Sequence, residues 1–280
     1  MPLKLANRST IMDVLVDGSL VIDVRMKSMS TNISITQFIP TNPFNKNVLE
    51  LFMNEESADV VFEVNNESFC QSGEHTNKKS KTTTSFYAHR LILKNNASAL
   101  YEMCGGKEGI TTVSITDVKP KIFEYMLYYA YGGKLSDIKL KANAKDIINA
   151  CDKYGVVHLK LEAEASYVKS TDITMENMMD NLLYADSKNL ALIKEAVMDY
   201  ILANKGDIIG KVSFNDFPGH LVTDLLTAVA RGEQQPEGEG DSKDYNKMRV
   251  GKLRTMLDDK GLDVDGSREA MIALLKEHNA

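Results

Sequence analysis

The pattern of hydrophobic and polar positions changes its period along this 280-residue chain. Two β-rich runs, Ile11–Val16 and Ser19–Met26, flank Asp17-Gly18, a dipeptide that is typical of a two-residue hairpin turn. Further on, Asp59–Val64 has the β-branched and aromatic residues of a strand, and Phe86-Tyr87 is predicted to pair with it before a helix opens near Ala88. The first half of the chain therefore contains a small sheet.

Most of the remaining apolar residues recur at helical spacing. A short helix is expected before the sheet, at residues 47–54, and a second helical run at 91–104 is interrupted at residues 95–98. The further predicted helices span residues 121–131, 144–154, 159–169, 174–185, 190–204 and 214–231. The chain is thus predicted to be α+β, a short sheet flanked by helices and followed by an all-helical region.

Polar segments separate these elements. Asn65–Ser85 is rich in Ser, Thr and Lys and far longer than an ordinary hairpin loop, so we expect a solvated loop there. Glu233–Asp241 has the acidic, Gly- and Pro-containing composition of a linker. Beyond it, Met248–Lys260 predicts a helix that ends at a Lys-Gly C-cap, and a second helix follows Val264.

The sequence between residues 59 and 93 resembles the BTB/POZ domain. The resemblance rests on Asp59–Val64 and on Phe86–Leu93, which contains Ala88-His89-Arg90, and it continues through Ile115–Pro120, Phe123–Lys134 and Ala150–Val156 in the family's order. It implies the BTB/POZ fold and a dimeric interaction module without an active site.

Three other stretches resemble neighbours of such domains. Residues 17–26 are similar to the last strands of the MATH domain of speckle-type POZ adaptors, residues 171–201 to a BACK-type helical extension, and residues 250–275 to the SAP motif. The MATH-like part is only a remnant, and its strands either dock on the same chain or pair with another copy. The expected division is an N-terminal β-hairpin (1–43), a BTB/POZ domain (44–168), a BACK-like region (169–232), an acidic linker (233–244) and a SAP motif (245–280).

The resemblance implies two interaction sites in the BTB/POZ domain. The predicted dimer interface consists of Leu49, Phe52, Asp59, His89, Arg90 and Ile92. Docking of cullin-3 is expected at Met103, Glu108 and Tyr154. The family's hydrophobic-x-Glu docking motif is altered, because Gly106 stands two positions before Glu108.

The SAP motif suggests a local contact with DNA. Its candidate DNA-binding residues are Arg249, Lys252, Arg254, Gly266, Ser267 and Arg268. Residues 241–280 nevertheless carry eight Lys and Arg against eight Asp and Glu, so the module is neutral and releases few counterions on binding phosphate. We therefore expect weak DNA binding at most and favour protein docking or a packed structural role.

Composition narrows the function further. A net charge of −6 disfavours nucleic-acid binding by the whole chain, and an odd number of cysteines, three, disfavours a disulfide framework. Neither a signal peptide nor a membrane-spanning run is evident, which favours the cytoplasm, the nucleus or both. The five histidines lack metal-ligand spacing and no catalytic motif occurs, so we expect no enzyme, metal or cofactor.

The sequence thus predicts a homodimeric adaptor that recruits an unidentified protein substrate to a cullin-3 RING ubiquitin ligase. The alternative is a nuclear or chromatin scaffold, in which BTB dimerisation joins two SAP modules that bind DNA or protein.

Overall fold

The computed structural model describes residues 42–66, 82–106, 109–208, 218–232 and 244–278. All described helices and strands belong to a compact unit that begins at Pro43. The predicted N-terminal hairpin, the acidic linker and Glu108 lie outside the described residues.

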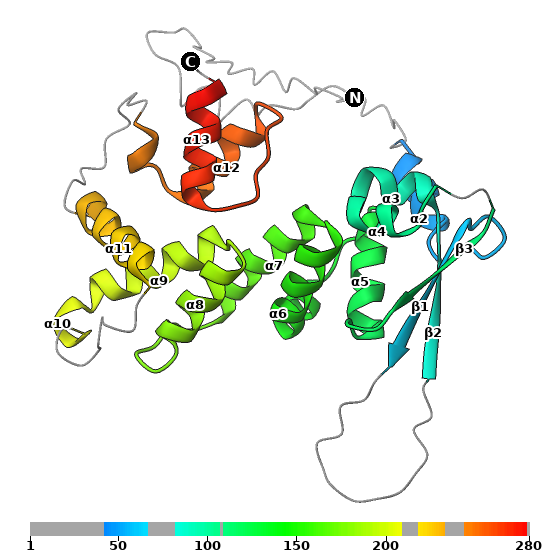
Figure 1. Cartoon of the computed structure of the whole chain (residues 1–280), viewed down its shortest axis with the longest axis horizontal. Helices are drawn as coiled ribbons and strands as arrows, with labels where there is room; N and C mark the ends of the chain where they lie inside the picture. The colour runs from blue at the N-terminus through cyan, green and yellow to red at the C-terminus, as the bar shows by residue number, and fades with distance from the viewer. Residues whose placement is uncertain (1–41, 67–81, 107–108, 209–217, 233–243, 279–280) are drawn as a thin grey trace, which may run out of the picture. The chain divides into compact units, whose positions relative to one another are not determined.

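The sheet has three strands in the order β2-β1-β3 (Figure 1), namely β1 (Val60–Asn66), β2 (Thr82–Ala88) and β3 (Thr111–Ile115). β1 runs antiparallel to β2 and parallel to β3. The register pairs Val61 with Tyr87, which confirms the predicted hairpin. Alternate residues of β1, Val60, Phe62 and Val64, are fully buried, as the period of a strand requires.

Both hairpin strands are longer than the sequence pattern suggests. The prediction that residues 65–85 form one loop is wrong at its two ends, because Asn65 pairs with Thr83 and Asn66 with Thr82. The Thr83 hydroxyl also donates to Asn65 Oδ1 at 3.0 Å. Threonine has a high strand propensity, so a polar Thr run can extend a ladder without any apolar residue.

Four helices accompany the sheet: α2 (Phe44–Glu50), α3 (Arg90–Asn96), α4 (Ser98–Met103) and α5 (Pro120–Ala130). α5 lies against β1 (Figure 1), and its Phe123 ring is 5.2 Å from the rings of Phe62 and Phe86. Pro120 is the first residue of α5, which begins one residue before the predicted start at 121. α2 ends four residues earlier than predicted, and Met53 follows it with a positive φ of 60°.

The chain then continues as helices α6 (Asp137–Tyr154), α7 (Val157–Ser170), α8 (Met178–Ser187), α9 (Ala191–Ala203), α10 (Lys205–Ile208) and α11 (Gly219–Gly232). α6 begins seven residues before the predicted start at residue 144, and the backbone is non-helical at Asn143. α8 begins four residues after the predicted start, because the Asn177 side chain accepts a hydrogen bond from the Thr174 amide and holds a turn there.

The C-terminal elements, η2 (Tyr245–Lys247), α12 (Val250–Asp258) and α13 (Arg268–His278), form a small core of their own. Gly261, at φ 64°, follows α12, and the Leu262 amide donates to the Leu257 carbonyl, which confirms the predicted glycine C-cap. The buried Ala191 of α9 belongs to the same apolar cluster.

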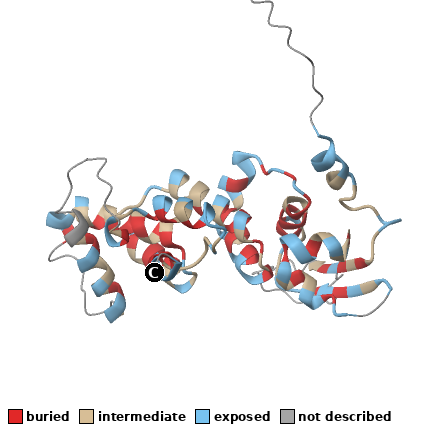
Figure 2. Cartoon of the chain, turned by 90° about the horizontal axis from the view of Figure 1, so that it is seen from above, coloured by how far each residue is buried: buried red, intermediate tan, exposed pale blue. Residues whose placement is uncertain are grey.

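Buried residues line the faces on which neighbouring elements meet (Figure 2). Cys104 and Cys151 are among them, as expected for small apolar side chains. Among the described helices, none has both the length and the apolar character to cross a bilayer.

A glycine after α5 provides a test of this packing. A Cβ atom at Gly133 would lie 2.2 Å from Cε1 of Tyr128, whose ring packs edge-on against Phe52. We expect Gly133→Ala to lower the free energy of unfolding by about 1–3 kcal/mol, because the Tyr128 ring must move.

The measurement is urea denaturation followed by circular dichroism, with Gly251→Ala as the matched control. A Cβ at Gly251 in α12 meets no atom within 4 Å, so the control should stabilise the protein by about 0.5–1 kcal/mol through helix propensity. Equal stability of the two variants would contradict this packing.

Candidate functional site

A polar corner joins β1 to the start of α3. The Asp59 carboxylate accepts a hydrogen bond from the Arg90 amide at 2.8 Å, and this amide belongs to the first residue of α3. The N-cap residue of α3, His89, makes no side-chain capping bond, so a carboxylate from a distant residue caps the helix instead. The Arg90 guanidinium donates hydrogen bonds to the Gly109 carbonyl and the Thr111 hydroxyl.

His89 lies at the centre of a second set of contacts in this corner. Its Nε2 is 2.8 Å from the Ser57 hydroxyl, and its Nδ1 is 2.7 Å from the hydroxyl of Tyr131, whose side chain is buried. The Tyr131 oxygen also accepts the His89 backbone amide at 2.9 Å. Because Tyr131 is buried and its hydroxyl proton needs an acceptor, we assign that proton to the bond with Nδ1, which leaves the imidazole proton on Nε2.

This tautomer argues against catalysis at the corner. Ser57 and His89 have the separation of a nucleophile and its general base, with Tyr131 in the orienting position. A protonated Nε2 donates to the serine oxygen, however, and cannot take up its proton. Burial lowers the pKa of His89, and the charge of Asp59 opposes that shift only in part. The ring is therefore a neutral structural element near pH 7.

The apolar residues predicted for a dimer interface lie around this corner. Leu49, Phe52 and Ile92 are half-buried and pack against the main core. The Phe52 ring lies 5.8 Å from that of Tyr131, which connects the residues after α2 to the histidine cluster. The structure thus brings Phe52 and His89 together around one tyrosine, while their role in dimerisation stays a prediction.

Two of the three predicted docking residues, Met103 and Tyr154, are described, and they differ in accessibility. Met103, the last residue of α4, is 44% exposed, whereas Tyr154 is 1% exposed. The Tyr154 hydroxyl donates to Asp117 Oδ1, and Lys153 Nζ donates to Oδ2, each at 2.6 Å. Burial raises the pKa of Asp117, but these two hydrogen bonds outweigh it and hold the pKa below its usual value. Tyr154 can thus position Asp117 but offers a partner almost no surface.

The arginines of the candidate DNA-binding set are engaged within the chain. Arg249 pairs with Asp199 of α9 through both terminal nitrogens, and Arg254 pairs with Glu164 of α7 at 2.7 Å. Arg268 is 9% exposed and donates to backbone carbonyls instead of facing solvent. Its acceptors are the carbonyl oxygens of Tyr245, Asn246 and Met248.

The other members of that set remain nearer the surface. Lys252 is exposed in α12, Gly266 has a φ of 110°, and the Ser267 hydroxyl accepts from the Ala270 amide at the start of α13. DNA binding by these residues stays a prediction. No local pattern in the sequence points to Glu164 or Asp199, because each acceptor lies at least 50 residues from its arginine.

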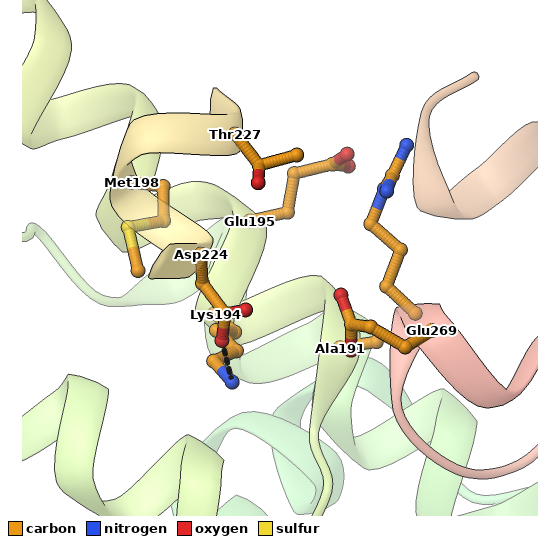
Figure 3. Close-up of a pocket in the computed structure, with 8 residues that line it drawn as sticks. Ala191, Lys194, Glu195, Met198, Asp224, Thr227 and Glu269 are labelled. Atoms are coloured by element: carbon orange, nitrogen blue, oxygen red, sulfur yellow. Dashed lines mark ion pairs between the residues drawn. The ribbon is translucent and has the colours of Figure 1, made fainter. Parts of the chain in front are cut away.

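A small hollow lies between α9, α11 and α13 (Figure 3). Lys194 pairs there with Asp224 at 2.5 Å and with Asp186 at 2.9 Å. The cavity volume is about 30 Å³, which corresponds to roughly one water molecule. Within the described residues, no cluster of three or more His, Cys, Asp or Glu side chains could hold a metal ion.

Comparison with known proteins agrees with this architecture. Residues 48–171 match the model of the BTB/POZ domain, and residues 244–280 match that of the SAP domain. The chain is 24% identical over 223 residues to BTB/POZ and MATH domain-containing protein 4 of Arabidopsis thaliana, which covers 72% of this chain and 43% of that protein.

Mouse proteins are similar over a shorter region. TD and POZ domain-containing protein 1-like of Mus musculus is 29% identical over 155 residues, 53% of this chain and 42% of that protein. TD and POZ domain-containing protein 4 of Mus musculus is 26% identical over 155 residues, 53% of this chain and 41% of that protein. The chain spans less than half the length of these curated relatives.

The lowered pKa of His89 predicts a pH dependence of stability. Between the folded pKa and the unfolded value of about 6.5, the unfolded chain binds the additional proton. Stability should therefore fall as the pH is lowered from 7 through that window. Urea denaturation at successive pH values should show a smaller dependence in His89→Gln. The control His158→Gln, which changes an exposed residue of α7, should retain the wild-type slope, and a loss of slope in both variants would contradict the assignment.

Proposed function

We propose that this chain, which carries a BTB/POZ domain at residues 48–171 and a SAP domain at residues 244–280, is a homodimeric adaptor that recruits a protein substrate to a cullin-3 ubiquitin ligase. The BTB/POZ domain and the BTB/MATH and TD-POZ relatives make it a protein-interaction adaptor. Dimerisation, the ligase and the substrate are the proposed parts. A location in the cytoplasm, the nucleus or both is part of the same proposal.

The observation that carries the proposal is the apolar surface of α2 and α3. The described helix α2 has no buried residue, although it contains Phe44, Val48 and Leu49, and Phe44 is 66% exposed. In α3, Leu91 is 72% exposed. Exposed apolar side chains of this size are typical of surfaces that bind another protein. A second copy can cover them, because a two-fold axis brings the same surface of each subunit together.

A single charge should disrupt this dimer. Leu91→Asp places a carboxylate on the exposed face of α3, where burial in an interface would remove its hydration. We expect dimer affinity to fall by at least about tenfold, equivalent to about 1.4 kcal/mol. Light scattering over a concentration series measures it.

Ile138→Asp is the matched control, because Ile138 in α6 is 81% exposed and belongs to neither helix. The control should keep the mass of the wild type. If Leu91→Asp keeps a dimer of unchanged affinity, α3 is not in the interface.

Cullin-3 docking is proposed at the end of α4. Met103 is exposed there, and Ile110, a few residues later, is 71% exposed. Asp117 and Lys153 add a polar pair supported by the Tyr154 hydroxyl. Exposed apolar residues and a positioned ion pair are the two kinds of group that form the apolar core and the polar rim of a protein interface.

The variant Met103→Asp tests this docking. Capture of purified cullin-3 by the full chain should drop at least about tenfold, because an apolar anchor becomes a charge. Ile138→Asp should capture cullin-3 like the wild type, and both variants should remain dimers. Equal capture by Met103→Asp would reject this site, and failure of the wild type to bind cullin-3 would reject the ligase role.

The SAP domain supports a second candidate function, a nuclear scaffold that joins two SAP modules on chromatin. The favourable observation is the turn that precedes α13, where Gly266 and Ser267 adjoin a helix start, with Lys252 exposed on α12. Dimerisation would add avidity to two weak contacts. We rank it second because Arg249, Arg254 and Arg268 already have partners within the chain.

A further inference from the structure

The SAP domain packs on α7 and α9 through a surface that combines apolar and ionic contacts. Ala191 is 3% exposed and lies in the same cluster as Val250 and Leu253 of α12, with the half-buried Leu192 packed beside it. The ionic part consists of five residues, which we call the clasp. They are the acids Glu164, Glu195 and Asp199 and the arginines Arg249 and Arg254.

Two of the clasp acids also cap helices. Glu164 is fully buried, and its Oε1 accepts the amides of Leu192 at 2.8 Å and Ile193 at 3.2 Å, while its Oε2 accepts from Arg254. These amides belong to the first turn of α9, whose own N-cap residue makes no side-chain bond. Glu164 therefore stabilises a helix start and holds a SAP arginine with the same carboxylate.

Glu195 of α9 likewise caps a helix and binds a SAP arginine. Its carboxylate accepts the Val250 amide at 3.2 Å, the first amide of α12, and lies 3.3 Å from Arg249 Nε. Asp199, one turn along α9, accepts from the two terminal nitrogens of the same guanidinium. The hydrogen bond to Asp199 raises the pKa of Arg249, which burial opposes. The guanidinium of Arg249 thus lies between two carboxylates, with its terminal nitrogens on Asp199 and its Nε beside Glu195.

A third ionic contact holds the turn before α13. Lys160 of α7 is 3% exposed and pairs at 2.8 Å with both Asp152 and Asp265. Burial lowers the pKa of Lys160, but the hydrogen bonds to these two carboxylates outweigh it and leave the pKa raised. Asp265 directly precedes Gly266 and Ser267, the turn predicted to meet phosphate. Binding of that turn to a duplex would have to accommodate or break a buried ion pair.

We propose that the clasp and a DNA duplex are mutually exclusive partners of the SAP domain, so that in the docked domain Arg249 and Arg254 hold carboxylates instead of phosphates. Asp199 binds both terminal nitrogens of Arg249 and Glu195 lies beside its Nε, while Arg254 donates to Glu164. Release of Arg254 would also leave the fully buried Glu164 without its counter-charge, which is strongly unfavourable.

The small hollow between α9, α11 and α13 leaves little room for a ligand. In Figure 3, Lys194 and Asp224 form the ion pair below Thr227 of α11, and Glu195 and Glu269 line the same hollow. Its volume of about 30 Å³ admits a water molecule but no phosphate group bearing a sugar. The side chain of Arg254 is 14% exposed and pairs with the fully buried Glu164 of α7, so a duplex that binds Arg254 must break this pair.

Asp199→Asn tests the proposal without changing the SAP domain itself. Asp199 is 45% exposed, so the variant should fold. Asp180→Asn is the matched control, since Asp180 is an exposed residue of α8 and its replacement changes the net charge equally. Fluorescence anisotropy of a labelled DNA duplex is measured with each full-length protein over a series of salt concentrations.

The variant Asp199→Asn should bind the duplex more tightly than the wild type and than Asp180→Asn. The plot of log K against log salt should keep its slope, because every duplex-bound protein has released its SAP domain and contacts the same phosphates. Equal affinity of Asp199→Asn and Asp180→Asn for the duplex would overturn the proposal. Failure of every protein to bind DNA at low salt would also overturn it, because a freed arginine would then have no phosphate to hold.

Hydrogen exchange provides an independent readout. The Val250 amide donates to Glu195 only while the SAP domain is docked, so saturating duplex should accelerate exchange in residues 250–258 of the Asp199→Asn protein. Duplex binding that leaves this exchange unchanged would show that DNA and the clasp can be held together, which contradicts exclusivity.

Discussion

Carboxylates from one element cap the first turn of helices elsewhere in the chain, and three junctions depend on this interaction. Asp59, which precedes β1, caps α3, Glu164 of α7 caps α9, and Glu195 of α9 caps α12. None of these helices receives a bond from the side chain of its own N-cap residue. Since the first amides of a helix lack intrahelical partners, each remote carboxylate satisfies a donor and fixes the position of a helix at once.

Three of the described arginines lie beside these carboxylates or their neighbours. Arg90 lies beside Asp59, Arg254 binds Glu164, and Arg249 binds Glu195 and Asp199. A buried carboxylate is costly without a counter-charge, so each cap is accompanied by a guanidinium. Cationic groups that the motifs alone would assign to binding are thus used to join elements.

The proposed BTB/POZ and SAP interfaces differ in whether their residues already have partners within the chain. Leu91 of α3 and Met103 of α4 are exposed apolar residues, which gain stability when a partner covers them. Arg249 and Arg254 of the SAP domain already bind carboxylates, so a new partner must first break these bonds. The BTB/POZ domain therefore exposes apolar residues that a partner can cover, whereas these two SAP arginines are already paired within the chain. This difference favours an adaptor over a DNA-binding scaffold.

The sequence by itself determined the local features. Alternation in β1 predicted the hairpin and its pairing with Phe86, Pro120 marked the start of α5, and Gly261 marked the end of α12. These features depend on residues a few positions apart, whose periodicity and turn chemistry can be read directly. The BTB/POZ and SAP motifs were recognisable for the same reason.

Only the tertiary structure decided how charged and aromatic side chains are used. It buried Tyr154, turned Arg268 toward backbone carbonyls, extended β2 to Thr82 and joined Glu164 to residues of two other helices. A motif gives the residue type at a position, but burial and pairing depend on partners that lie 20 to 90 residues away. The side chain of an arginine in a DNA-binding motif can bind a carboxylate or a phosphate, and the fold places the carboxylate within reach.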